Sequence, residues 1–388
     1  MKVKPADRAN SVKEYYFSTR LRQIDEMRRS GADIINLGIG SPDQPPSSNT
    51  VEKLVEEAKK PGVHGYQSYA GSPLLRKALS EWYLRYFKVS LNPDCEILPL
   101  IGSKEGIMHI SLAFVNPGDE VLVPDPGYPS YTSVTRLVGG IVKTYDLTEN
   151  NGWLPDFDVL EHTDLSKVKL MWINYPHMPS GTRASYILFE RLVRFAEKYN
   201  ILICNDNPYS FILNDKYISI LYIDGARDIA LELNSLSKSH NMAGWRIGMV
   251  AGHNEYIKSI IRVKSNMDSG MFLPLQLAAS EALTNGEDWY EKVNAVYGKR
   301  RKIAEEIMTV LNCSYNPDQT GLFLWGRIPE NIASGELLVD DLLEKAHVFI
   351  TPGLIFGKNG DRYIRISLCS EEERLAEAKK RVVKYLNN

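Results

Sequence analysis

A lysine flanked by serines gives this sequence its clearest chemical signal. Lys238 lies close to Ser235, Ser237 and Ser239, and Arg246 follows eight residues later. A lysine in such tight, glycine-rich surroundings can lose its proton and attack a carbonyl carbon, which forms a Schiff base. Hydroxyl groups and an arginine are suited to binding a phosphate. An imine-forming lysine beside a phosphate site points to pyridoxal 5'-phosphate (PLP), whereas a solvated loop lysine is the alternative.

A carboxylate at the end of an apolar run would complete such a site. Asp206 follows the run Ile201–Asn205, and ligands of open parallel sheets bind beyond the carboxyl ends of the strands. An ionised carboxylate there needs a partner, which a protonated pyridine nitrogen would supply. That proton makes PLP an electron sink. Tyr209 could donate to the ring hydroxyl. The alternatives are a helix N-cap for Asp206 and a core tyrosine for Tyr209.

Two turns carry further candidate residues for cofactor binding. Lys104, in Gly102–Gly106, puts a positive charge at the positive end of a helix dipole, which is unfavourable unless an anion lies nearby. A phosphate on the free N–H groups would supply that anion, whereas Ser103 as an ordinary N-cap is the alternative. Tyr128 lies among prolines that form a rigid turn, which would hold its ring flat against a cofactor ring. A packed surface tyrosine is the alternative.

Arg365 is the candidate for binding a substrate carboxylate. In the segment 363–369, alternation puts Ile364 and Ile366 on one face of a strand and Arg365 on the other. An arginine that projects into a cleft can bind a carboxylate through two hydrogen bonds. The alternative is a solvated strand face.

The elements that must position these residues follow an alternating pattern. Between about residues 98 and 253, short apolar runs alternate with helical patterns, which predicts a mostly parallel sheet covered by helices on both faces. The apolar runs are Glu120–Val123, Ile141–Tyr145, Leu170–Asn174, Ile201–Asn205, Ile229–Asn234 and Ile247–Ala251. The helical patterns include Val12–Ser30 ahead of this region, Lys104–Val115 and Leu188–Tyr199.

The pattern changes after about Leu283. The expected elements there are a long charged helix, two hairpin-like strands and a last helix, at Trp289–Leu311, Gly321–Trp325, Tyr363–Leu368 and Glu371–Leu386. We therefore expect an α/β protein with a large three-layer α/β/α domain over residues 46–283. A smaller α+β domain is expected from both termini, residues 1–45 and 284–388. Tyr15, Tyr16 and Phe17 either line the pocket or pack an N-terminal helix on the small domain.

Composition narrows the class of protein. The net charge is −2, so nothing indicates nucleic acid or an anionic membrane as partner. There is no apolar run long enough to span a bilayer and no signal-peptide core. Widely spaced cysteines argue for a reducing compartment and against a zinc site. We therefore expect a cytoplasmic protein that has no metal ion. The cysteines are Cys95, Cys204, Cys313 and Cys369.

Together these residues resemble class I/II aminotransferases of PLP fold type I, from about Asn36 to the C-terminal helix. The resemblance implies transfer of an amino group between an L-amino acid and a 2-oxo acid, with 2-oxoglutarate and glutamate as the expected couple. It also implies a homodimer whose active sites are shared at the interface. The segments Gly102–Gly106 and Lys264–Gly270 resemble the subgroup with diaminopimelate, aspartate and aromatic donors. That likeness is too general to choose among these donors.

The resemblance also assigns residues. Lys238 would bind PLP covalently and act as general base and acid, with Asp206 and Tyr209 as the other catalytic residues. The remaining cofactor contacts would be Ser103, Lys104, Tyr128, Ser235, Arg246 and, on the neighbouring subunit's phosphate, Tyr66. The substrate contacts would be Arg365 for the α-carboxylate, with Ile39, Gly40 and Asn174.

One position departs from the family pattern. Relatives usually read Asn-Asn-Pro-Thr-Gly where this chain has His177–Gly181, so Met178 replaces the asparagine that donates to the ring oxygen. Methionine cannot donate a hydrogen bond. We therefore expect the Schiff base of Lys238 to keep its proton to a higher pH than in asparagine-bearing relatives.

Other functions remain open. A PLP-dependent carbon–sulfur β-lyase would use the same scaffold with a different leaving group. A non-catalytic PLP-binding regulator would carry a DNA-binding module, for which the roughly 30 residues before Asn36 are too few. A nicotinamide dehydrogenase is disfavoured, because Asp43 stands where G-x-G-x-x-G needs its third glycine.

Overall fold

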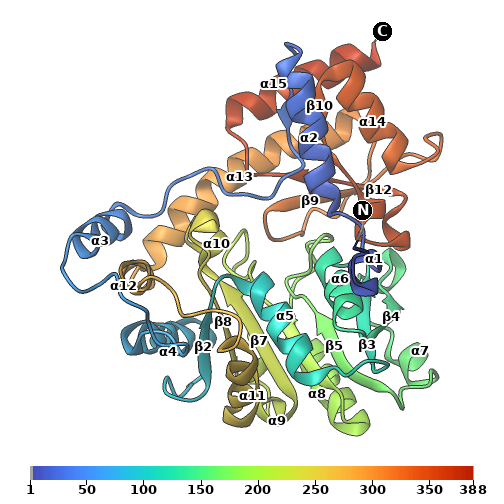
Figure 1. Ribbon diagram of the computed structural model, residues 1–388. Helices are drawn as coiled ribbons and strands as arrows, with labels where there is room; N and C mark the ends of the chain where they lie inside the picture. The colour runs from blue at the N-terminus through green and yellow to red at the C-terminus, as the bar shows by residue number, and fades with distance from the viewer. Residues whose placement is uncertain (1–2, 388) are drawn as a thin grey trace.

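The structure is a computed structural model that describes residues 3–387. Residues 1, 2 and 388, which belong to the expected small domain, lie outside the described residues. The largest sheet has seven strands in the order β2-β8-β7-β6-β5-β3-β4 (Figure 1). Its strands are β2 (Ile97–Leu100), β3 (Glu120–Asp125), β4 (Ile141–Asp146), β5 (Val168–Ile173), β6 (Leu202–Asp206), β7 (Ala230–Ser235) and β8 (Gly248–Gly252).

This sheet is mostly parallel, as predicted. Strands β4, β3, β5, β6 and β7 pair in parallel, and only the two pairings of β8 are antiparallel. The expected strands agree with the observed ones to within two residues, but the sequence analysis missed β2. That strand contains Pro99, which weakens a strand pattern and is tolerated at a sheet edge.

Helices cover both faces of the sheet because side chains alternate along its strands. In β5, Leu170 and Trp172 face one core cluster, whereas Met171 and Ile173 face the other. Helices α5 (Ser103–Phe114), α6 (Pro129–Leu137) and α11 (Asn254–Lys264) pack in the first cluster. Helices α4 (Pro73–Phe87) and α8 (Tyr186–Tyr199) pack in the second. Further α-helices of this part are α3 (Ser48–Ala58), α7 (Phe157–Glu161), α9 (Ala226–Ile229), α10 (Leu236–Ser239) and α12 (Leu273–Ala282).

The two ends of the chain meet in a second group of elements, at the top of Figure 1. Strand β1 (Ile35–Asn36) pairs in parallel with β10 (Val348–Phe349). Strand β12 (Tyr363–Ser367) pairs antiparallel with β9 (Phe323–Arg327), as expected, and also with β11 (Thr351–Pro352). The helices of this group are α2 (Tyr16–Arg29), α13 (Glu287–Val310), α14 (Gly335–Ala346) and α15 (Glu372–Leu386). A short helix, α1 (Asp7–Asn10), precedes them.

Three helices begin at least two residues from the expected position. Helix α2 begins at Tyr16 and not at Val12, α8 at Tyr186 and not at Leu188, and the long helix α13 at Glu287 and not at Trp289. Among the described residues, no helix combines the length and the apolar character that a membrane crossing requires.

Candidate active site

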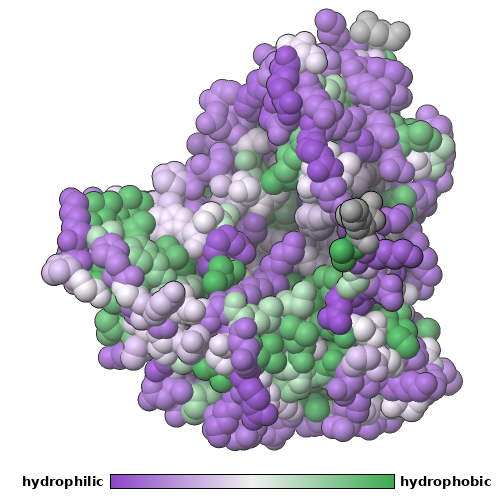
Figure 2. All heavy atoms as spheres, viewed as in Figure 1, coloured by the Kyte–Doolittle hydropathy of each residue, from purple (hydrophilic) through white to green (hydrophobic). Residues whose placement is uncertain are grey.

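A cavity of about 560 Å³ lies where the parallel strands end and helix α2 approaches the large sheet. Figure 2 shows the surface hollowed in this region. Asn174, Asp206 and Ser235 stand at the carboxyl ends of β5, β6 and β7, so the strands bring residues far apart in sequence to one edge. Twelve of the thirteen predicted site residues line the cavity: Ile39, Gly40, Ser103, Lys104, Tyr128, Asn174, Asp206, Tyr209, Ser235, Lys238, Arg246 and Arg365.

Lys238 enters the cavity from a single helical turn that directly follows β7. Ser235 caps this turn, because its hydroxyl accepts a hydrogen bond from the Ser237 N–H at 3.1 Å. The Lys238 ammonium donates to the Gly40 carbonyl. Burial, with the positive charges of Arg365 and Arg246, lowers the pKa of Lys238. Lys238 is thus not a solvated loop lysine, and its environment favours the neutral amine that attacks carbonyl carbon.

Arg246 and the start of α5 form a cradle for an anion. Gly102 precedes the helix at φ +79°, and a Cβ atom there would lie only 2.1 Å from Nη2 of Arg246. A Cβ on Gly248 would lie 2.7 Å from the Ser103 nitrogen. The two glycines therefore let the guanidinium and the free N–H groups of α5 come together, as phosphate binding requires. The Ser103 side chain makes no capping hydrogen bond, which disfavours the alternative that this residue is an ordinary helix N-cap.

Lys104 adds a third cation to the cavity. Its ammonium lies 4.5 Å from the centre of the Tyr15 ring. Burial, and then the charge of Arg246, lowers the pKa of Lys104. A cation held by an aromatic face and repelled by an arginine remains available to an anionic ligand.

Asp206 has one carboxylate oxygen engaged and one free. Tyr131 donates to Oδ2 at 3.0 Å, and Oδ1 is buried without a hydrogen-bond partner among the described residues. Burial raises the pKa of Asp206 to about 7, against the opposing effect of the Tyr131 hydrogen bond. No helix starts within the next few residues, so the N-cap interpretation does not apply. The free oxygen fits the N–H of a protonated pyridine ring.

The sequence analysis missed Tyr131. Its ring stacks on Trp172 with centroids 5.0 Å apart and planes 2° apart, and this packing aims the hydroxyl at Asp206. Tyr131 lies one helical turn after Tyr128, so both tyrosines present their rings on the same side of α6. That three-residue spacing was the available signal.

The raised pKa of Asp206 predicts a pH dependence of stability in cofactor-free protein. A carboxyl that ionises near pH 4 when unfolded but near pH 7 when folded makes the folded state bind the extra proton between these values. Its contribution to the free energy of unfolding therefore falls by up to about 1.4 kcal/mol per pH unit as pH rises toward 7, and is constant above about 8. Urea denaturation of wild type and Asp206→Asn from pH 5 to 8.5 measures this difference. If the free energies of unfolding of the two proteins change with pH in parallel, the prediction is contradicted.

Arg365 projects from β12 into the cavity and is 3% exposed, so the solvated-face alternative is wrong. Its guanidinium carbon lies 3.8 Å from the centre of the Phe323 ring and 4.6 Å from that of Phe356. Nη2 donates to the Gly38 carbonyl at 2.8 Å, and Nη1 lies 3.3 Å from the Met178 sulfur. Burial lowers the pKa of Arg365 to about 10. Within the described part of the chain, no carboxylate pairs with this cation, which suits it to a ligand carboxylate.

The remaining predicted residues differ in how directly they face a ligand. Asn174 uses its amide inside the protein, because it donates to the Asp206 carbonyl and accepts from the Met178 N–H at 2.8 Å. It therefore fixes the loop that carries Met178. Tyr209 lines the cavity and packs edge-on against Phe323. Tyr66 lies outside the cavity with 94% of its surface exposed.

Helix α2 and Tyr15, the residue that precedes it, supply cavity residues that the sequence analysis left open or missed. Tyr15 and Phe17 line the cavity, whereas Tyr16 instead accepts a hydrogen bond from Arg20 at 2.9 Å. Ser18 and Leu21 also line it, and the sequence analysis assigned neither residue to the site. Their place depends on how an N-terminal helix packs against a distant sheet.

The fold and this cavity define a fold type I enzyme, the architecture of the PLP-dependent aminotransferases. Residues 32–382 match the family "Aminotransferase class I and II". The chain belongs to this family. It is therefore an aminotransferase, which moves an amino group between an L-amino acid and a 2-oxo acid.

Similar proteins agree with this assignment. The LL-diaminopimelate aminotransferase of Aquifex aeolicus is 42% identical over 97% of this chain and 98% of its own. That of Halothermothrix orenii is 40% identical over 97% of both. Apo-BacF from Bacillus subtilis has a TM-score of 0.95 with 36% identity over 100% of this chain and 99% of its own. An aspartate aminotransferase mutant from Thermus thermophilus has a TM-score of 0.91 with 27% identity, over 99% of this chain and 100% of its own. These similarities favour an aminotransferase over the carbon–sulfur lyase.

Proposed function

We propose that this chain is a PLP-dependent aminotransferase whose amino donor is LL-diaminopimelate and whose acceptor is 2-oxoglutarate. The observation that carries the proposal is about 40% identity to LL-diaminopimelate aminotransferases over nearly the whole chain. A cavity lined by two lysines and two arginines is consistent with it, because the cofactor phosphate and the carboxylates of this donor are anions. The proposed compartment is the cytoplasm.

The donor set of the cavity fits PLP. The cradle of Arg246, Ser235 and the α5 amides would hold the phosphate, and the free oxygen of Asp206 would hold the ring nitrogen. Tyr128 would lie against the ring and Tyr209 near its hydroxyl. When bound, PLP supplies an electron sink for the carbanion that forms when the substrate loses its α-proton.

The protein's own groups orient the substrate and move the proton. Arg365 binds the α-carboxylate and so places the Cα–H bond beside Lys238. The Lys238 amine, whose pKa burial lowers, would act as the base that takes the proton from Cα and as the acid that gives it back. Asp206 would hold a proton on the ring nitrogen through its free carboxylate oxygen. Phe323 and Phe356 hold water away from Arg365.

Met178 is proposed to set the pH at which the Lys238–cofactor bond changes its visible absorption. A buried thioether offers no donor to the ring oxygen. We expect Met178→Asn to move the midpoint of a spectrophotometric pH titration downward. Arg365 lies against the same sulfur, so KM for the donor serves as the control for disturbed substrate binding. An unchanged midpoint would contradict this role.

We also propose the expected homodimer and the expected division of the chain at residues 46–283. Tyr66 and its surroundings support the dimer, because large apolar side chains are exposed there and Figure 2 shows an apolar area over α3. In this proposal Tyr66 reaches the phosphate of the partner subunit. The pairing of β1 with β10 supports a small domain built from both termini.

A panel of donors tests the substrate. Purified protein is incubated with 2-oxoglutarate and LL-diaminopimelate, aspartate, phenylalanine or tyrosine, and glutamate formation is measured. We expect kcat/KM to be highest for LL-diaminopimelate. A preference for the aromatic donors would reject this donor and would indicate that Tyr15 and Phe17 select an aromatic side chain.

A further inference from the structure

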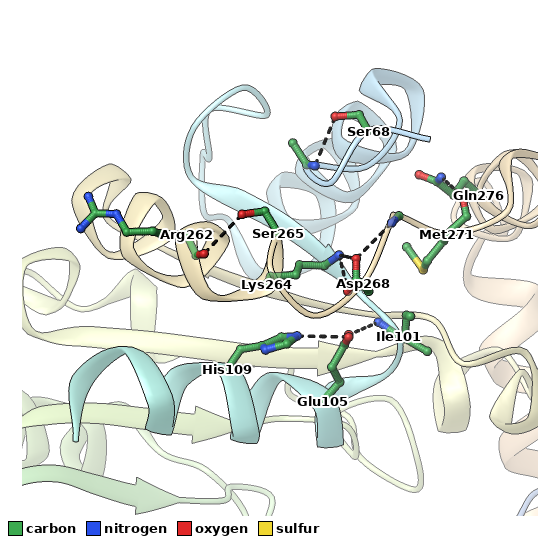
Figure 3. Close-up of polar contacts among 12 residues, drawn as sticks. Ser68, Ile101, Glu105, His109, Arg262, Lys264, Ser265, Asp268, Met271 and Gln276 are labelled. Atoms are coloured by element: carbon green, nitrogen blue, oxygen red, sulfur yellow. Dashed lines mark hydrogen bonds and ion pairs between the residues drawn. The ribbon is translucent and has the colours of Figure 1, made fainter. Parts of the chain in front are cut away.

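Outside the cavity, four ionisable side chains form a cluster between helices α5 and α11. This charge cluster consists of Glu105, His109, Lys264 and Asp268. The Lys264 ammonium lies 2.7 Å from both Asp268 oxygens, and Lys264 is 1% exposed. His109 Nε2 lies 3.1 Å from a Glu105 oxygen. Figure 3 shows the Lys264–Asp268 pair facing the His109–Glu105 pair across the gap between the helices.

The cluster contains the residue types that bind metal ions, but the ammonium group of Lys264 takes the place of the cation. Ligand atoms of Glu105, His109 and Asp268 lie within 4.8 Å of one another. Lys264, however, already occupies both oxygens of Asp268. Although burial raises the pKa of Asp268, the hydrogen bonds from Lys264 and the Gly270 N–H outweigh that effect and lower it. Lys264 thus serves as the cation of this cluster.

One end of the charge cluster fixes the start of α5. The second oxygen of Glu105 accepts a hydrogen bond from the Ile101 N–H at 2.5 Å. Ile101 immediately precedes Gly102, whose close approach to Arg246 forms the anion cradle. Glu105 therefore holds the turn that presents the α5 amides to the proposed phosphate.

The other end fixes a surface segment. Asp268 accepts from the Gly270 N–H at 3.0 Å, and Gly270 has φ +81°. A Cβ atom at Gly270 would lie 2.7 Å from the carbonyl oxygens of both Gln67 and Ser68. The turn that Asp268 shapes thus packs directly on the backbone next to Tyr66.

The side chain of Gln276 connects the two surface segments, residues 66–72 and 265–272. Gln276 accepts from the Ser72 N–H and donates to the Met271 carbonyl, both at 2.6 Å. Four of the side chains that these segments expose are large and apolar, which is typical of a surface that another protein covers. They are Tyr66 (94% exposed), Tyr69 (44%), Met267 (57%) and Phe272 (42%).

We propose that the charge cluster couples two parts of the protein. When an anion occupies the phosphate cradle, the cluster makes the backbone of segments 66–72 and 265–272 more rigid. An anion in the cradle holds the first turn of α5 and hence Glu105. Glu105 faces Asp268, which shapes the turn under the exposed segments. By linkage, a second copy that binds these segments would tighten cofactor binding to the same degree. This inference rests on the proposed function, because it takes PLP as the ligand and a second copy as the partner.

Hydrogen–deuterium exchange of the full-length protein, with and without PLP, tests the coupling. In wild type, we expect PLP to slow exchange in 101–106 and also, by roughly 5-fold or more, in 265–272. Inorganic phosphate should protect the same segments, because it fills only the cradle, and pyridoxal should not. In Lys264→Met, PLP should still protect 101–106 but no longer 265–272. Lys258→Met removes an exposed pair on the same helix and should behave as wild type.

The outcomes separate this inference from the proposed function. If wild type takes up no PLP, the proposed function fails. If wild type binds PLP but 265–272 exchanges at an unchanged rate, or if Lys264→Met keeps the wild-type protection, the coupling is wrong. Should Lys264→Met not fold, Asp268→Asn replaces it, because asparagine can still accept from the Gly270 N–H while it weakens the pairing with Lys264.

Discussion

Replacing Lys238 by alanine is expected to reduce kcat by about 10⁴-fold or more. The variant loses the amine that removes the substrate α-proton, and it also loses the covalent tether for the cofactor. Among residues 3–387, the other lysine that lines the cavity is Lys104, which is held at the Tyr15 ring. Steady-state glutamate formation with saturating donor and acceptor measures the loss.

The matched control is Lys258→Ala, since that lysine is exposed on α11 and pairs with Glu255. It should retain wild-type kcat. Addition of methylamine to the Lys238→Ala variant supplies a small external base and should restore part of the activity. Transamination by Lys238→Ala at the wild-type rate would refute the role assigned to this residue.

Asp206→Asn is expected to lower kcat/KM by roughly 150- to 5,000-fold, the equivalent of about 3–5 kcal/mol for removing one partner of a buried charge pair. Asparagine fills the same space at the end of β6 but is neutral, so it does not keep the ring nitrogen protonated. Pre-steady-state kinetics should place the loss in the proton-transfer step and not in donor binding, because Arg365 is untouched.

Tyr131→Phe provides a graded comparison at the same carboxylate. It removes one hydrogen bond of 3.0 Å from Asp206 but leaves the charge, so a loss of about 10-fold is expected. Equal losses in the two variants would indicate that packing around β6, and not the charge of Asp206, controls the rate. Wild-type kcat/KM in Asp206→Asn would remove Asp206 from the mechanism.

The side of the cavity that we propose for the cofactor was predictable from sequence because its signals are local. Ser235, Lys238 and Arg246 lie within twelve residues, and these residue types indicate Schiff-base formation beside a phosphate site. Asp206 was predictable for a different reason. It ends an apolar run, and parallel strands present their carboxyl ends at one edge of a sheet. The position of Asp206 could therefore be inferred from the fold class alone.

Contacts between distant segments were not predictable. Alternation assigned Arg365 to one face of a strand, but whether that face is solvated depends on Phe323 and Phe356 packing beside it. The hydroxyl of Tyr131 reaches Asp206 only because α6 packs over β5. The spacing of Lys264 and Asp268 indicates a helical ion pair, yet nothing in the sequence places Glu105 opposite it.

Reduction of the PLP-treated protein with borohydride, followed by peptide mass spectrometry, tests the central claim most directly. The account predicts a phosphopyridoxyl group on the peptide that contains Lys238, and loss of that label in Lys238→Ala. A protein that stays colourless and unlabelled, or a label on another lysine with Lys238 unmodified, would contradict it.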